Sequence, residues 1–590
     1  MKFRTIAEAI ETVGTRAPHR GLTFQDMKGN ETYYPFPELV EAATQRAAGL
    51  QALGLKKGDR FGLIVVEPED FVLTFLGALR IGVLPVPLYP PLSFGSLDAY
   101  AARTAKVLDS AGARLLVASA KLRNVLWALI DEVPSLERLV QAEDLTTATG
   151  EADLPVIEPD DLAFLQYTSG STSDPKGVMV THGSLAANCW AIMNPGIKSH
   201  MDRDLGVSWL PLYHDMGLIG FVIAPITQAV PIVYIPTLRF LRRPRVWFEA
   251  MHRHQATLTF APNFAYALAV RKAREQDLEA WDLSKVRILG CGAEPIHPET
   301  MRSFLDLFTT HCDLAEEAML PCYGMAEATL AISFIDVDGK MPFNVVDADA
   351  FQEDGTVSAP QSDDAATFEH VSCGVPFPDH EIGIFSDDGV MLGESREGEI
   401  RVRGASNTVG YFDNPEATAA AFLPDGWLRT GDLGYIHDGQ LYVTGRIKDL
   451  IILNGRNIHP QAIEWTAAEQ QGVRKGNVVA FSRPGANSEE LIVVLETRDA
   501  DHETLAATVK KAVQREHSVT VTQVVCVSAG VLPKTSSGKL QRRKTRDLFM
   551  RGRLGVEGSR DPSSTAGTVT LAKHMAKSMW TRAKTAVLSR

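Results

Sequence analysis

The sequence lacks the features that mark secreted, metal-binding or disulfide-rich proteins. Its six cysteines, at positions 189, 291, 312, 322, 373 and 526, show no paired metal-binding spacing and are too few for a disulfide framework in 590 residues. The first fifteen residues alternate charged and apolar side chains and lack the apolar core of a signal peptide. We therefore expect a protein of the reducing cytoplasm.

Positive charge is also in deficit. Lys and Arg number 59 against 72 Asp and Glu, a net charge of −13, which argues against a nucleic-acid partner. Residues 216–236 contain no charged side chain, but they include three prolines, two glycines and Gln228. This composition favours a buried helix followed by a buried strand over a transmembrane span.

Both common nucleotide-binding motifs are absent. Residues 167–177 read YTSGSTSDPKG, in which the Lys-Gly order and the preceding proline exclude a P-loop. Gly290 and Gly292 lack the third glycine of a dinucleotide fingerprint, because Pro295 stands there. What the first segment does contain is a set of groups that can converge on phosphate oxygens: Thr168, Ser169, Gly170, Ser171, Thr172 and Lys176. A flexible surface loop is the alternative interpretation.

Alternating strand and helix patterns predict an α/β protein. Short β-branched runs at 60–66, 83–88, 113–118, 162–167, 232–235, 257–260 and 286–289 alternate with helical segments, which indicates parallel sheets with crossover helices. Past residue 372 the strands lie closer together, at 399–404 and 441–444, and suggest a small antiparallel barrel-like unit. A compact α/β segment follows residue 446, with strands near 477–482, 490–496 and 522–527.

Two segments depart from this pattern. Residues 347–367 are polar, acidic and rich in small side chains, and are predicted to be a loop-like insertion. Residues 571–590 carry five Lys or Arg and no acid, with apolar residues at fourfold spacing. That pattern describes a basic amphipathic helix that could contact an anionic membrane or an acidic partner, although a frayed terminus without function fits equally well.

Several further segments carry groups suited to chemistry on ATP. Gly292, Ala293 and Glu294 follow a predicted strand, where ligands gather in open α/β sheets. Tyr323 offers an aromatic face to a purine, and Glu327 offers a carboxylate to Mg²⁺. Asp432 could accept hydrogen bonds from ribose hydroxyls, Arg446 lies beyond it, and Lys539 sits on a glycine-containing turn. Singly, each could equally be a core aromatic or a solvated charge.

In order, segments 167–177, 292–294, 323–327, 429–432, 445–449 and 533–539 resemble the motif series of the adenylate-forming superfamily, from about residue 5 to 550. Within it the sequence is most similar to the fatty acyl-AMP ligase family. The matching features are WLPLYHDMGLIG at 209–220, Gln166, Ala326 and NGRNIHP at 454–460. Ser173 departs from the glycine that many superfamily members carry there.

The resemblance implies a large amino-terminal domain, residues 1–447, with two parallel-rich sheets and the insertion. It also implies a small mobile carboxy-terminal domain, 448–555, that turns about a hinge at Asp449, and a tail, 556–590.

The resemblance also assigns roles to single residues. Lys539 is expected to bridge the carboxylate and the α-phosphate, Glu327 to bind Mg²⁺, and Lys176 with the loop hydroxyls to hold the outer phosphates. Nucleotide contacts are expected from residues 292–294, from Tyr323, Gly324, Met325 and Ala326, and from Asp432 and Arg446. The acyl-binding residues would be Trp209, His214, Met216, Gly217 and Ile219, with His214 near the reacting groups.

The expected reaction uses ATP and Mg²⁺ to convert a medium- or long-chain fatty acid to acyl-AMP. The resemblance implies transfer of the acyl group to the phosphopantetheine thiol of an acyl carrier protein, or of a carrier domain in a polyketide or peptide synthase. Three alternatives stay open: a fatty acyl-CoA synthetase, an amino-acid-activating domain, and an inactive ATP-binding or membrane-tethered scaffold.

Overall fold

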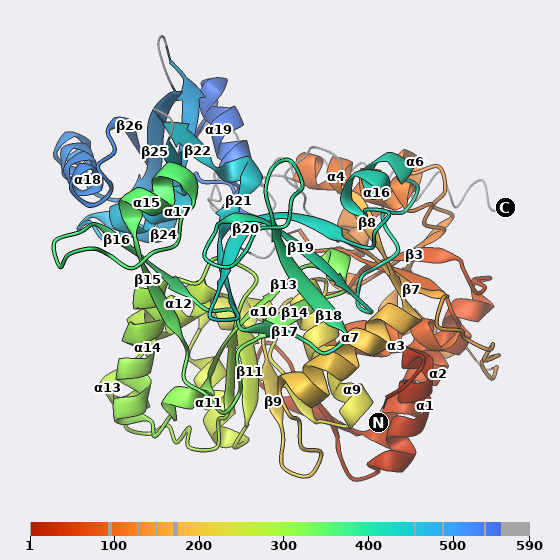
Figure 1. Cartoon of the computed structure of the whole chain (residues 1–590). Coiled ribbons are helices and arrows are strands. Elements are labelled where there is room, and N and C mark those ends of the chain that lie inside the picture. The colour runs from red at the N-terminus through yellow and green to blue at the C-terminus, as the bar shows by residue number, and fades with distance from the viewer. Residues whose placement is uncertain are drawn as a thin grey trace.

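The structure is a computed structural model that describes residues 2–555, except 92–96, 128, 149, 169–174, 454–455, 486–488 and 536–537. The side chain of Ala99 is also left out. Figure 1 shows a mixed α/β architecture in which the carboxy-terminal elements α17, α18, α19 and β24 to β26 gather at one end of the molecule. The predicted α/β class is confirmed.

The largest sheet has nine strands in the order β17-β14-β13-β12-β11-β9-β10-β1-β2. Its centre, from β13 to β1, is parallel, and the strands at both edges are antiparallel. The bounds are β1 Gly21–Gln25, β2 Glu31–Pro35, β9 Gly206–Ser208, β10 Ile232–Tyr234, β11 Leu258–Ala261, β12 Ile288–Cys291, β13 Met319–Gly324, β14 Ala331–Phe334 and β17 Val375–Pro376.

A second sheet, in the order β4-β3-β5-β6, is wholly parallel. Its strands are β3 Arg60–Ile64, β4 Leu84–Pro87, β5 Leu115–Ala118 and β6 Arg138–Gln141. They read as nearly continuous apolar runs because helices cover the faces of parallel sheets. The predicted strands on both sides of the Ser-rich segment are confirmed as β7, Leu162–Thr168, and β8, Lys176–Thr181. The expectation that 162–167 belongs to a parallel sheet is wrong, because β7 and β8 form a separate antiparallel hairpin.

The antiparallel unit is a four-stranded sheet in the order β18-β19-β20-β21. Its strands are β18 His380–Phe385, β19 Gly398–Gly404, β20 Leu428–His437 and β21 Gln440–Arg446. A separate hairpin, β15 Phe343–Asp347 with β16 Thr367–Val371, supports the insertion.

The prediction that the insertion is only a loop is wrong, because it contains helix α15, Ala348–Asp354. The Asp347 side chain caps this helix by accepting from the amide of Ala350, and Gly355 ends it at a φ of 74°. Phe351 is buried against Tyr435, which gives the short helix a tertiary anchor that its polar composition concealed.

The carboxy-terminal part has its own apolar core, formed by side chains from Ile451 to Val521. It contains β22 Ile451–Leu453, β23 Arg456–Ile458, β24 Val473–Pro484, β25 Glu489–Thr497 and β26 Val521–Val527, which confirms the predicted strands. β24 pairs antiparallel and β26 pairs parallel to the central β25.

Helices pack around these sheets. α1 begins with a capping box between Thr5 and Glu8, and the largely apolar α3 is buried from Phe71 to Arg80. The helices are α1 Ile6–Arg16, α2 Phe36–Ala52, α3 Pro68–Arg80, α4 Leu97–Ser110, α5 Arg123–Leu126, α6 Leu129–Glu132, α7 His182–Ala191, α8 Asp215–Leu218, α9 Ala224–Gln228, α10 Thr237–Arg242, α11 Val246–Arg253, α12 Asn263–Lys272, α13 Glu275–Leu278, α14 Pro298–His311, α15 Ala348–Asp354, α16 Pro415–Ala421, α17 Pro460–Ala468, α18 His502–His517 and α19 Arg542–Met550.

The uncharged segment 216–236 is buried, as predicted. α8 continues through a π-helical turn, Ile219–Ile223, into α9 and then into β10. Within the described part of the chain, no helix is both long and apolar enough to cross a membrane.

A buried ion-pair network fastens α19 to the start of the carboxy-terminal part. The Arg542 guanidinium donates to both Glu464 oxygens at 2.8 Å and also binds Asp449.

We expect Arg542→Ala to lower the free energy of unfolding by about 3–5 kcal/mol, because it leaves two carboxylates together without their cation. The urea midpoint of the carboxy-terminal transition measures this loss. Lys544→Ala, on the exposed face of the same helix, is the matched control, and equal midpoints for the two variants would contradict the role of the network.

Candidate active site

A cleft of about 2840 Å³ brings together residues that are far apart in the sequence. It lies among the large sheet, the antiparallel sheet and the carboxy-terminal elements α17 and α19. The predicted site residues that line it are Thr168, Lys176, Trp209, His214, Met216, Ala293, Glu294, Tyr323, Gly324, Met325, Ala326, Glu327, Asp432, Arg446, Asp449 and Lys539. The predicted nucleotide-binding residues Ser169, Gly170, Ser171 and Thr172 lie outside the described residues.

Three other calls lie elsewhere. Gly217 lines a smaller neighbouring cavity. Gly292 lies under the cleft wall, where a Cβ atom would come within 2.6 Å of Cys322 Sγ, so only glycine fits this approach. Ile219 is fully buried in the core and does not line the cleft, whereas Met216 and Gly220, four residues apart on one helical face, do.

Asp432 lies at the centre of a polar triad in which Tyr323 and Asp432 are buried and Arg446 is exposed. Tyr323, at the end of β13, donates its hydroxyl to Asp432 Oδ2 at 2.8 Å, and Arg446 Nε donates to Oδ1 at 2.9 Å. Asp432 and Arg446 are cross-strand partners on β20 and β21, which fixes their approach. Each carboxylate oxygen keeps a lone pair for a further donor, so ribose hydroxyls can still be accepted here.

Glu327 presents a buried carboxylate to the same cleft. Burial raises the pKa of the Glu327 carboxyl, and a hydrogen bond from the Tyr411 hydroxyl at 2.8 Å opposes that rise. Lys176 Nζ lies 4.8 Å from the centre of the Tyr411 ring. Tyr411 therefore connects the cation at the end of the Ser-rich segment with the carboxylate.

Thr168 and Lys176 face each other as the last cross-strand pair of the hairpin. Both residues line the cleft, so the strand ends that flank the Ser-rich segment meet at its wall.

Lys539 enters the cleft on a turn from the carboxy-terminal part. The Thr535 amide donates to the Lys539 carbonyl at 2.7 Å, the Lys539 amide donates to Thr535 Oγ1 at 3.0 Å, and Gly538 has a φ of 92°. Lys539 lines a cavity of about 20 Å³ together with Trp209, His214, Met216, Gly217 and Ala293. Burial lowers the pKa of the Lys539 ammonium, and the carboxylates of Asp215 and Glu294 oppose that shift.

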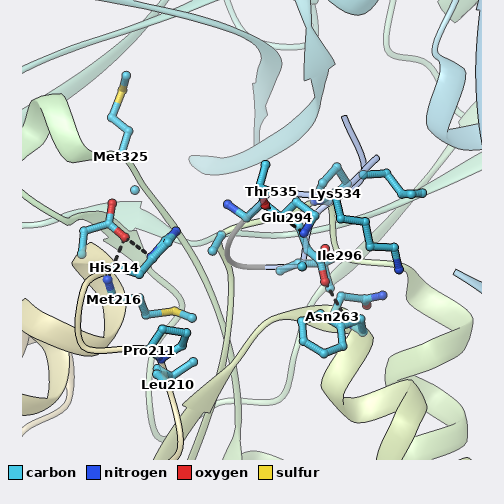
Figure 2. Close-up of a pocket in the computed structure, with 18 of the residues that line it drawn as sticks. Leu210, Pro211, His214, Met216, Asn263, Glu294, Ile296, Met325, Lys534 and Thr535 are labelled. Atoms are coloured by element: carbon cyan, nitrogen blue, oxygen red, sulfur yellow. Dashed lines mark hydrogen bonds and ion pairs between the residues drawn. The ribbon is translucent and has the colours of Figure 1, made fainter. Parts of the chain in front are cut away.

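His214 is paired with its neighbour Asp215, with Nδ1 and Oδ1 2.5 Å apart. Burial alone would raise the pKa of the Asp215 carboxyl, but His214 and Lys539 bring it down to about 2. Figure 2 shows His214 and Met216 on one side of the pocket and Glu294, Lys534 and Thr535 across from them. The second side combines a residue from the middle of the chain, Glu294, with a turn of the carboxy-terminal part.

Glu294 follows Ala293, whose φ of 68° is unusual for a residue with a Cβ atom. Glu294 Oε1 accepts from the Phe264 amide at 2.8 Å, while burial raises the pKa of the Glu294 carboxyl. This acid therefore holds the start of α12 against the strand end that carries Ala293.

Sequence reasoning missed several lining residues. Tyr411 carries no motif signal of its own, whereas Asp215 lies inside the matching segment 209–220 and could have been found there. An apolar arm of the cleft is lined by Ile192, Met193, Ile197, Phe221, Pro225, Val230, Leu258, Phe260 and Phe334. Such residues read as ordinary core in a sequence, and only their position beside the cleft distinguishes them.

Mg²⁺ fits the donors present. Among the described residues no cluster of three or more His, Cys, Asp or Glu could hold a metal ion. Mg²⁺, however, is commonly bound by one or two carboxylates together with substrate phosphates, and the Glu327 carboxylate lines the cleft.

Comparison with known protein families agrees with this geometry. The family described as AMP-binding enzyme matches residues 12–412, and the AMP domain of Disco-interacting protein 2-like proteins matches residues 448–559. The fold, the cleft and these two matches define an adenylate-forming enzyme, which uses ATP.

Individual relatives narrow the class. A Caulobacter vibrioides protein provisionally named as an acyl-CoA synthetase is 37% identical and covers 94% of this chain and 96% of its own. A medium-chain-fatty-acid–[acyl-carrier-protein] ligase of Moorena producens is 32% identical, covering 88% and 90%. A structure from a study of fatty acyl-adenylate ligases of E. coli and L. pneumophila is 35% identical, covers 93% and 98%, and has a TM-score of 0.88. The chain belongs to the fatty acyl-AMP ligases of the AMP-binding family.

We expect Tyr411→Phe to lower kcat/KM for MgATP by about tenfold, since a hydrogen bond to a charged group is worth about 1.5–3 kcal/mol. Glu327 must be ionised to bind a cation, so activity falls as pH drops through its raised pKa. Loss of the hydroxyl raises that pKa further, and the acid limb of the pH–rate profile should move to higher pH. Tyr34→Phe, whose hydroxyl donates to the Glu69 carboxylate at 2.7 Å outside the cleft, is the control. An unmoved acid limb in the Tyr411 variant would contradict this assignment.

Proposed function

We propose that this enzyme activates a medium- or long-chain fatty acid to acyl-AMP with Mg·ATP, and passes the acyl group to a phosphopantetheine thiol on an acyl carrier protein in the cytoplasm. The observation that carries the proposal is the meeting of Lys539 with His214, Trp209 and Met216 in one cavity, beside the Asp432 triad. This arrangement supports a role for Lys539 between the predicted acyl and nucleotide sites.

In the first step a carboxylate oxygen attacks the α-phosphorus and pyrophosphate leaves. Lys539 places positive charge where the two anions meet, and a preorganised cation at such a point can supply several kcal/mol. Lys176 and the loop that precedes it hold the outer phosphates, and Asp432 accepts from the ribose. Bound through Glu327, Mg²⁺ would neutralise phosphate charge. The apolar arm of the cleft would hold the acyl chain.

The second step requires Lys539 to leave and a thiol to enter. We assign residues 1–447 to the fixed domain and 448–555 to the domain that turns about Asp449. Asp449 is bound by Arg542 of α19, so a turn at Asp449 would carry the lysine turn with α19. The tail, 556–590, lies outside the described residues, and its basic 571–590 segment stays a candidate for membrane contact.

The insertion supports a carrier thiol over coenzyme A. Its helix α15 is fastened to β23 of the carboxy-terminal part, because Arg456 Nη2 donates to Asp349 Oδ1 at 2.8 Å and also binds Gln352. Phe351 lies 5.7 Å from the His459 ring. Such contacts restrain the turning of the carboxy-terminal part that free coenzyme A would need. Because one relative is named as an acyl-CoA synthetase, coenzyme A is the alternative acceptor to test.

Lys539→Ala should lower acyl-AMP formation by about a thousandfold, since one transition-state donor is worth about 10²–10³ in kcat. ATP should still bind, because the Asp432 triad and Glu327 are intact. Pyrophosphate release and nucleotide binding are measured on the same preparation. Undiminished pyrophosphate release would contradict the assignment, and the inactive-scaffold alternative would be supported if the unaltered enzyme released none with any fatty acid.

A deletion tests the acceptor. Asp347 and Thr367 are cross-strand partners, so residues 348–366 can be replaced by an Asn-Gly turn that keeps the hairpin. We expect the unaltered enzyme to load a carrier protein but to make little acyl-CoA, and the deletion variant to gain acyl-CoA synthesis. Arg456→Ala, which removes only the link, should give a smaller gain. Efficient acyl-CoA formation by the unaltered enzyme would support the synthetase alternative.

A further inference from the structure

Two neighbouring segments gather cations on a chain whose net charge is −13. Residues 237–245, which form α10 and the turn after it, carry four arginines and no acid. Residues 270–274, at the end of α12, add Arg271, Lys272 and Arg274. A local excess of one sign against the global charge indicates an anionic partner.

The two segments adjoin. Trp209 contacts Phe240 of α10 and Phe264 of α12, with ring centroids 3.6 and 6.2 Å away. Arg245 Nη1 lies 2.8 Å from Asp277 Oδ2, just beyond the second segment. Both helices therefore pack around Trp209, and both line the cleft: α10 through Leu238 and Leu241, and α12 through Leu268 and Arg271.

Only part of this charge is neutralised within the protein. Arg239 binds Gln25, while Arg243 and Arg245 pair with Glu249. The side chains of four other exposed cations have no hydrogen bond or ion pair to any residue that the structure describes: Arg242, Arg271, Lys272 and Arg274. These four are free to bind an external anion.

The same surface exposes leucines. Leu238 and Leu241 are three residues apart on α10 and are 36% and 50% exposed, whereas Phe240 between them is fully buried. Apolar side chains flanked by arginines at the rim of the apolar arm of the cleft form a surface that is partly apolar and partly cationic. Exposed leucines beside unpaired cations suit a membrane interface, where apolar side chains enter the bilayer and cations bind headgroups. An acidic protein is the alternative that the test distinguishes.

We propose that Leu238, Leu241, Arg242, Arg271, Lys272 and Arg274, the α10–α12 surface, dock on an anionic lipid bilayer. The arginines and lysine would bind lipid phosphates while the two leucines enter the interface. Docking would bring the cleft to the compartment in which a fatty acid dissolves. Binding to the bilayer is independent of the proposed function, whereas delivery of fatty acid to the cleft rests on it.

The test measures sedimentation of the full chain with phosphatidylglycerol-containing vesicles and with pure phosphatidylcholine vesicles. The charge variant is Arg242→Glu/Lys272→Glu/Arg274→Glu, none of which lines the cleft. Since each cation near an anionic surface contributes about 1 kcal/mol, we expect about hundredfold weaker binding to phosphatidylglycerol vesicles. Leu238→Ser/Leu241→Ser should weaken binding and make the remainder fully salt-sensitive.

Two controls make the result specific. Arg138→Glu/Arg498→Glu/Lys511→Glu removes the same net charge from exposed positions elsewhere and should bind like the unaltered chain. Lys573→Glu/Lys577→Glu tests the basic tail. The proposal is overturned if the unaltered chain does not bind phosphatidylglycerol vesicles, if the charge variant binds equally well, or if only the tail variant loses binding. It is also overturned if the charge variant loses binding to an acidic carrier protein but still binds the vesicles.

Activity separates docking from catalysis. The charge variant should keep its rate with a medium-chain acid in solution and lose about tenfold with a long-chain acid supplied in phosphatidylglycerol vesicles. An equal loss with both substrates would contradict a delivery role. If neither substrate gives pyrophosphate even with the unaltered enzyme, the proposed function fails, while vesicle sedimentation still decides whether the surface binds lipid.

Discussion

The cleft has to overcome the electrostatic repulsion between a carboxylate and a triphosphate, and its architecture depends on this constraint. Two anions meet only where cations are placed beforehand, and such cations act most strongly in a site shielded from water. Lys176 enters from a hairpin of the large part, and Lys539 enters on a turn of the carboxy-terminal part. Asp215 and Glu294 oppose the pKa drop that burial imposes on Lys539. The acids beside the lysine thus help to keep it charged.

The parts of the fold that local patterns specify were predictable. Apolar β-branched runs that alternate with helical segments predicted parallel strands, which is right for the centre of the large sheet and for the second sheet but not for 162–167. That there are two parallel-rich sheets was implied by the family resemblance. Motif residues such as Tyr323, Asp432 and Lys539 were predictable as a set because their order along the chain resembles that of a known family. Their convergence on one cleft agrees with that resemblance.

Other features depend on contacts that a single sequence does not display. Tyr411 reaches Glu327 because residues 408–411 run beside the Glu327 turn, and no spacing rule encodes that approach. Helix α15 depends on Phe351 packing against Tyr435, more than eighty positions away. Ile219 points into the core while Met216 and Gly220 line the cleft, because neighbouring positions on a helix face different sides. Exposure of Leu238 and Leu241 was equally hidden, since leucines read as core.

The fate of the carboxylate oxygens tests the central claim most directly. If a fatty carboxylate attacks the α-phosphorus and a thiol then attacks the acyl carbon, the bridging oxygen leaves with AMP. An acid labelled with ¹⁸O in both carboxyl oxygens should therefore give AMP with one ¹⁸O and pyrophosphate with none, as read by mass spectrometry after acyl transfer. Unlabelled AMP, or label in pyrophosphate, would contradict the account.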